Sequence, residues 1–115
     1  MKLALIASVA TVAAAAPAWQ AEPPLPVPRT EVAAAVSGHE ILVAGGYVED
    51  GSTTARTDLY DPSRKAWRQG PDLPEPLNHA AAATLRGAAV VVGGYGAAAA
   101  TVATDAISAS FTPRA

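Results

Sequence analysis

The sequence predicts an all-β protein made of two similar four-stranded antiparallel units behind an N-terminal signal helix. Ten prolines and nine glycines among 115 residues interrupt the chain too often for a helical bundle and suit short strands joined by turns. Apolar residues show no helical period of 3.6 beyond the N-terminal run. Several landmark residues recur after 48 positions, a spacing that fits one four-stranded unit.

The first element is the apolar run from Leu3 to Ala16, which follows the single charge of Lys2. A membrane-spanning helix needs about 20 apolar residues, so this run is too short to cross a bilayer. A basic start, a short apolar run and small residues at its end are typical of a secretory signal peptide. We expect residues 1–18 to be this peptide and the protein to be secreted or periplasmic. An uncleaved N-terminal helix or anchor is the alternative.

The rest of the chain repeats itself with a constant offset of 48 residues. A repeat of this length predicts a solenoid or propeller unit, and about 50 residues fits a four-stranded blade. The boundaries that follow are a last strand and linker at 19–30, a first repeat at 31–78 and an incomplete second repeat at 79–115. The paired landmarks are Trp19 with Trp67, Leu25-Pro26 with Leu73-Pro74, and Gly45-Gly46-Tyr47 with Gly93-Gly94-Tyr95.

Short apolar runs between turn signals predict the strands of each repeat. In the first repeat they lie at 31–36, 41–44, 57–60 and 66–69. In the second repeat two strands are expected at 79–85 and 88–92, and a third at 104–107, with Ile107 in the place of Tyr60. A low-complexity alanine stretch replaces the polar loop of the first repeat, and no fourth strand is visible.

These residues resemble a kelch repeat. The resemblance rests on Val43-Ala44-Gly45-Gly46-Tyr47, then Asp58-Leu59-Tyr60-Asp61-Pro62, then Trp67, and it covers nearly everything from Trp19 to Thr104. It implies a kelch-type β-propeller in which Tyr60 and Trp67 pack between adjacent blades. It also implies that the pairs Gly45-Gly46 and Gly93-Gly94 allow close packing, so all six residues are expected to be structural.

The order of strands leaves two interpretations open. If the strands of a blade are called a to d from inside to outside, the chain contains d near Trp19, then a-b-c-d, then a-b-c. In the kelch family such rings close by strand sharing between the termini. Propellers contain 4 to 8 blades, so either the chain is the beginning of a longer, truncated propeller or several copies assemble head to tail. The degraded second repeat favours truncation.

Few residues predict catalytic chemistry. The sequence has no cysteine, which excludes a thiol nucleophile, a thiolate metal site and the Tyr–Cys copper centre of some secreted kelch-type oxidases. His39 and His79 lie 40 positions apart and out of register with the repeat, so they do not predict a metal pair. We therefore expect no metal and no cofactor. A formal net charge of −2 argues against a nucleic-acid partner.

The loops indicate where a ligand would bind. In an antiparallel meander the b–c and d–a loops emerge on one face, and these are the longer loops here. Arg29, Arg56, Asn78 and His79 lie in or beside them and are the candidate binding residues. Solvated loop side chains are the simpler alternative.

The leading functional hypothesis is an exported binding or interaction module without catalysis, with a protein or carbohydrate ligand and no membrane contact after signal cleavage. Head-to-tail self-assembly is a further expectation. The first alternative is a fragment of a sugar-processing kelch enzyme similar to a sialic-acid epimerase. The second is a non-functional truncated remnant, because Val, Ile, Leu and Phe make up only about a fifth of the chain.

Export can be tested by N-terminal sequencing of protein recovered outside the cytoplasm. The small residues before the two candidate cleavage sites predict a mature chain that begins at Ala16 or at Trp19. Cleavage after Ala16 is disfavoured because Pro17 would follow the scissile bond. An intact Met1 on the exported protein would contradict the signal peptide.

Overall fold

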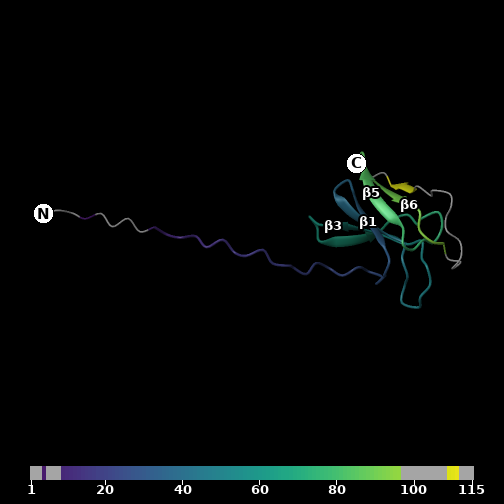
Figure 1. Ribbon diagram of the computed structural model, residues 1–115, viewed down its shortest axis with the longest axis horizontal. Coiled ribbons are helices and arrows are strands. Elements are labelled where there is room, and N and C mark those ends of the chain that lie inside the picture. Colours follow the sequence, from purple (N-terminus) through teal and green to yellow (C-terminus); the bar gives the residue numbers. More distant parts are fainter. Residues whose placement is uncertain (1–3, 5–8, 97–108, 112–115) are drawn as a thin grey trace.

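The computed structural model describes residues 4, 9–96 and 109–111, and this part of the chain contains strands and no helix (Figure 1). It confirms the all-β prediction. The strands form two antiparallel sheets, which we call the first and the second sheet. The first sheet has the order β1 (Ala33–Ser37), β2 (Glu40–Ala44), β3 (Thr57–Asp61), β4 (Ala66–Gln69). The second has the order β5 (Ala81–Leu85), β6 (Ala88–Val92), β7 (Ala109–Phe111).

The first sheet is a meander whose four strands form within two residues of the expected positions. Gly38, at φ 62°, turns β1 into β2 so that Ser37 pairs with Glu40. The turn from β3 to β4 is held by Asp61, whose Oδ1 accepts hydrogen bonds from the backbone N–H of Ser63 at 2.9 Å and of Arg64 at 3.2 Å. A short aspartate side chain thus satisfies the backbone where the strand must stop.

The second sheet repeats the first hairpin and then departs from it. Ala81 pairs with Val92 as Ala33 pairs with Ala44, at the same repeat positions. The expected third strand at 104–107 lies outside the described residues. The strand that pairs with β6 is β7, where Phe111 faces Ala89 as Tyr60 faces Ile41. Phe111 therefore takes the register position of Tyr60, and more residues separate β6 from β7 than separate β2 from β3.

Two expected elements are not seen in the described part of the chain. A fourth strand of the second sheet is not present among these residues, so a second four-stranded blade is not confirmed. The expected signal helix is not formed over residues 9–18, which are exposed and lead away from the sheets (Figure 1). An isolated helix of this length is marginal in water without a surface to pack on. Trp19 is fully exposed and belongs to no strand.

The hydrophobic core lies between the two sheets. A linker between β4 and β5 supplies Leu73 and Leu77, which pack with Leu59 of β3. The linker follows the first sheet closely, since Leu73 N–H donates to the Ala55 carbonyl at 2.8 Å and the Thr57 hydroxyl donates to the Pro71 carbonyl at 2.7 Å. The remaining buried core residues are Ala33, Leu42, Ala44, Ala89 and Val91.

Polar contacts hold the sheets against each other. Gly38 N–H donates to the Gly87 carbonyl at 2.8 Å, which joins the two hairpin turns. The Thr84 hydroxyl donates to the Val36 carbonyl at 2.7 Å. Near the same edge, Ala89 N–H donates to the Ser37 hydroxyl at 3.4 Å. The innermost strand β1 therefore lies beside the β5–β6 hairpin.

The glycine pair after β2 allows the linker to approach the first sheet. Gly45 has φ +65°, and a Cβ added there would lie 2.2 Å from the Leu77 carbonyl oxygen. Gly46 has φ +98°, and its N–H donates to the same Leu77 oxygen at 2.8 Å. A side chain at Gly45 would thus meet backbone that has no room to move.

Tyr60 and Trp67 do not pack between the two sheets. Tyr60 pairs with Ile41, which lies on the face of the first sheet opposite Leu42 and the core. The two rings lie 5.0 Å apart, and the N-terminal segment covers them: Trp67 Nε1–H donates to the Pro23 carbonyl at 2.8 Å, and the Tyr60 hydroxyl donates to the Glu22 carboxylate. This hydrogen bond raises the pKa of Tyr60 to about 12 and lowers the pKa of Glu22. Trp67 is only half-buried because no second sheet lies over it.

Substituting Gly45 tests the close approach of the linker. Gly45→Ala combines an unfavourable positive φ with a backbone clash, so we expect the free energy of unfolding to fall by about 2–5 kcal/mol. Gly51→Ala is the matched control, since Gly51 has φ +82° and open space around it, and we expect a loss of only about 1–2 kcal/mol. Denaturant unfolding of both variants measures the difference. Equal losses would show that the linker does not press on Gly45.

Candidate functional site

Four segments meet at one end of the two sheets. Tyr47, in the β2–β3 loop, bridges to Thr30 before β1, and Tyr95, after β6, bridges to Asn78 before β5. His79 N–H donates to the Glu31 carbonyl at 3.1 Å, which joins the two repeats at this end. We call this end, formed by residues 28–31, 45–56, 77–79 and 93–96, the loop face. It brings the four predicted binding residues to one end of the molecule but divides them between two clusters.

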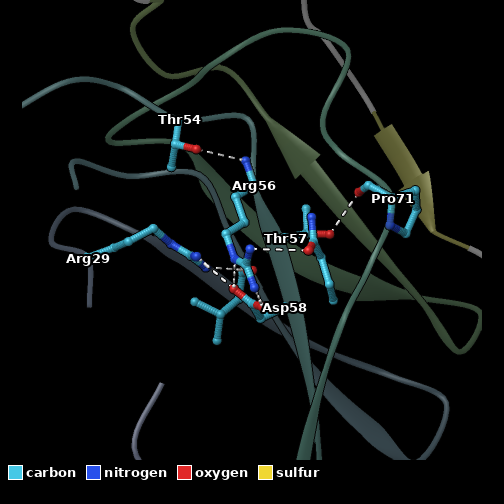
Figure 2. Close-up of polar contacts among 8 residues, drawn as sticks. Arg29, Thr54, Arg56, Thr57, Asp58 and Pro71 are labelled. Carbon is cyan, nitrogen blue, oxygen red and sulfur yellow. Dashed lines mark hydrogen bonds and ion pairs between the residues drawn. The ribbon is translucent and has the colours of Figure 1, made fainter. Parts of the chain in front are cut away.

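Arg29 and Arg56 form the first cluster, around Asp58 in the middle of β3 (Figure 2). Arg29 donates to Asp58 Oδ2 at 2.7 Å, and Arg56 donates to the two carboxylate oxygens at 2.9 and 2.7 Å. Arg56 also reaches Gln69 Oε1 at 3.2 Å on β4. Two guanidinium groups thus share one carboxylate, which ties the N-terminal segment and the β2–β3 loop to the sheet.

Burial decides what this cluster can do. The side chains of Arg29 and Asp58 are both 0% exposed, and that of Arg56 is 25% exposed. Burial by itself would raise the pKa of Asp58, but the hydrogen bonds from Arg56 and Arg29 outweigh it and hold this pKa below its ordinary value. The Arg29 side chain therefore acts as a structural clamp between the N-terminal segment and β3.

Asn78 and His79 form the second cluster, at the seam between the repeats. Asn78 is buried, and its Nδ2 donates to the Thr53 hydroxyl at 2.9 Å, which anchors the β2–β3 loop. Its Oδ1 lies 2.7 Å from His79 Nδ1. His79 is exposed and its Nε2 lies 3.2 Å from the Glu31 carboxylate. Of the four predicted residues, His79 has the most exposed side chain, at 46%.

The imidazole of His79 lies between two tyrosine rings. Its centroid is 6.0 Å from that of Tyr47 and 5.8 Å from that of Tyr95, and both contacts are edge-to-face. Tyr47 and Tyr95 occupy the same position of the two repeats, as do Glu31 and His79, which share φ values of 52° and 53°. The sequence analysis did not place Glu31 and the two tyrosines next to His79. The 48-residue spacing had nevertheless given Glu31 and His79 one repeat position, and Tyr47 and Tyr95 another.

An open groove adjoins this cluster. It has a volume of about 830 Å³, within the range of small-molecule sites. Tyr47 belongs both to the groove and to the cluster, so a ligand in the groove would lie beside the tyrosine that contacts His79. The lining residues are Pro28, Arg29, Thr30, Tyr47, Val48, Glu49 and Gly51.

Within the described residues, no three histidine or acidic side chains come together as a set that could hold a metal ion. The same part of the chain contains no helix of the length and apolar character needed to cross a membrane.

The meander, its glycine pair and the linker that folds back across it define a propeller-type repeat. Residues 28–74 match the family described as Kelch motif, so the chain carries a kelch repeat there and the predicted resemblance is confirmed. A solved structure titled "Structure of YjhT" shares the fold with a TM-score of 0.60 and 24% identity over 69% of this chain. The chain spans 25% of that structure's length. No curated protein sequence matches the chain significantly.

Substituting Asp58 tests the clamp. Asp58→Asn leaves two guanidinium groups without their counter-charge, so we expect the free energy of unfolding at pH 7 to fall by about 3–5 kcal/mol. Asp72→Asn is the control, because Asp72 is exposed, and its effect should be small. The pKa of Asp58 is lowered on folding. The stabilising contribution of this carboxylate is therefore present above pH 3.8 and is lost as the pH falls through the lowered pKa. The difference between wild type and Asp58→Asn should therefore shrink only below about pH 3.8.

Proposed function

We propose that the protein is an exported kelch-repeat binding module, part of a larger propeller and without catalysis of its own. The observation that carries the proposal is the exposed His79 between Tyr47 and Tyr95 beside an open groove. Loops that display polar and aromatic groups from a rigid sheet scaffold are typical of binding sites.

The chemistry of the loop face suits a carbohydrate or a protein ligand. Tyr95 is about half exposed, so part of its ring is available to an apolar face of a ligand. Glu31 and His79 add a carboxylate and an imidazole that lie 3.2 Å apart. Glu49 at the groove adds a second carboxylate, which disfavours a strongly anionic ligand such as nucleic acid.

Exposure of the N-terminal segment supports export. Residues 9–18 contain both candidate cleavage sites and are exposed without regular structure. A peptidase needs an accessible, extended backbone, and removal of this segment would take away no residue of the core.

The second candidate is a fragment of a sugar-processing kelch enzyme. The pair Glu31–His79 favours it, because a carboxylate and an imidazole 3.2 Å apart can exchange a proton with a substrate. The chain spans 25% of the length of the solved structure of similar fold, so other repeats of a larger propeller would supply the further groups of such a site.

A pair of histidine variants tests the proposed face. We expect His79→Ala to weaken binding of a retained glycan or protein at least tenfold, because the ring fixes both tyrosines and supplies a donor. His39→Ala is the matched control, since His39 is exposed in the β1–β2 turn at the opposite end of the sheet, and it should bind like the wild type. Glycan arrays and capture on immobilised protein measure both variants.

Two outcomes would decide against this proposal. Equal loss of binding in both variants would place the ligand elsewhere. Accelerated interconversion of sugar anomers by the wild-type chain, followed by proton NMR, would favour the enzyme.

A further inference from the structure

Two sheet faces carry exposed apolar side chains in the described part of the chain. Alternate residues of a strand point to opposite faces of its sheet. Strand positions next to core residues therefore lie on the outer face. The front face of the second sheet, which points away from the first, includes Leu85 at 62% and Val92 at 42% exposure. The back face of the first sheet, which points away from the second, includes Val36 at 51% and Ile41 at 38% exposure.

These two faces are counterparts of the pair that already packs inside the chain. The internal interface joins the front of the first sheet to the back of the second, for example where the Ser37 hydroxyl accepts from Ala89 N–H. Leu85 occupies the repeat position of Ser37, and Ile41 that of Ala89. The front of the second sheet therefore corresponds to the front of the first sheet, and the back of the first sheet corresponds to the back of the second.

Gly93 shows that the second sheet has room for the missing neighbour. Gly45 and Gly93 hold the same repeat position with φ +65° and +68°. The Leu77 carbonyl presses on Gly45, whereas nothing described lies within 4 Å of a Cβ added at Gly93. Arg29 holds the repeat position of Leu77. The Arg29 carbonyl of another first repeat is thus the group that would fill the space at Gly93.

The linker and the charges are arranged for the same contact. The segment from Glu22 to Arg29 already lies on the back face of the first sheet, held by Tyr60, Trp67 and Asp58. In the same way, the linker with Leu73 and Leu77 lies between the two sheets. In the second repeat, His79 occupies the position that Glu31 has in the first. A second copy docked in the same way would bring its Glu31 beside this His79 at the loop face.

We propose that the front face of the second sheet binds the back face of the first sheet of a second copy of this chain, head to tail. The contact repeats the internal interface, with Leu85 against Ile41 of the next copy and Gly93 against its Arg29 carbonyl. Heterologous contacts of this kind close into a ring when the rotation permits. Propellers of 4 to 8 blades correspond to about two to four copies of a two-sheet chain.

Glycine variants of the full chain test the contact by light scattering after size exclusion. We expect the wild type to form a discrete oligomer whose mass is a small multiple of one chain. Gly93→Ala should reduce the mass to that of one chain, because the added Cβ blocks the approach as it would at Gly45. Gly51→Ala, which has the same kind of positive φ and open surroundings, should leave the oligomer intact.

A cysteine pair tests the register without depending on the stability of the oligomer. The chain has no cysteine of its own, so Leu85→Cys with Ile41→Cys introduces the only thiols. We expect oxidation to link these positions between chains at least tenfold more than in the control pair Leu85→Cys with Arg64→Cys, since Arg64 is an exposed residue of the β3–β4 turn and lies outside the strands. Mass spectrometry of the linked peptides identifies the bond.

Several results would overturn the proposal. A mass of one chain at all concentrations would mean that no second copy binds these faces and would favour further repeats of a longer polypeptide as their partner. An oligomer or aggregate that survives Gly93→Ala and gives no excess of the 85–41 bond would be built on another surface. The histidine variants test the ligand at the loop face separately.

Discussion

The close approach of the Leu77 carbonyl to Gly45 and Gly46 is the constraint on which the rest of the structure depends. It lets the linker lie flat on the first sheet, so that Leu73 and Leu77 reach Leu59 and close the core. The same approach sets where β5 begins and therefore how the second sheet faces the first. A side chain at Gly45 would push the linker outward and separate the two sheets.

The loop face follows from that arrangement. Once the linker is fixed, buried Asn78 anchors the β2–β3 loop through Thr53, and His79 comes between two tyrosines that are 48 residues apart. A rigid frame thus holds an exposed imidazole beside a groove. The arginines next to this frame have another role, because a charge that is buried must be paired. Arg29 and Arg56 accordingly share Asp58 and hold the sheet together.

The two sheets pack against each other through one face each, and the N-terminal segment covers part of the other face of the first sheet at Tyr60, Trp67 and Asp58. The buried faces contribute apolar area and backbone hydrogen bonds such as that between Gly38 and Gly87. The outer faces keep Val36 and Leu85 in solvent. Repeat proteins derive much of their stability from contacts between neighbouring units, so these outer faces are where a further unit would add stability.

The sequence by itself determined the all-β class, the 48-residue repeat and the first six strands to within two residues, because alternating apolar runs, turn residues and glycine pairs act locally. The tertiary structure alone decided the rest. It paired Ala109–Phe111 with β6, a register that depends on strand pairing and not on repeat spacing. It also placed the side chain of Arg29 in a buried contact with Asp58 and brought Glu31, Tyr47 and Tyr95 around His79, because burial and proximity across the fold depend on packing between segments far apart in the chain.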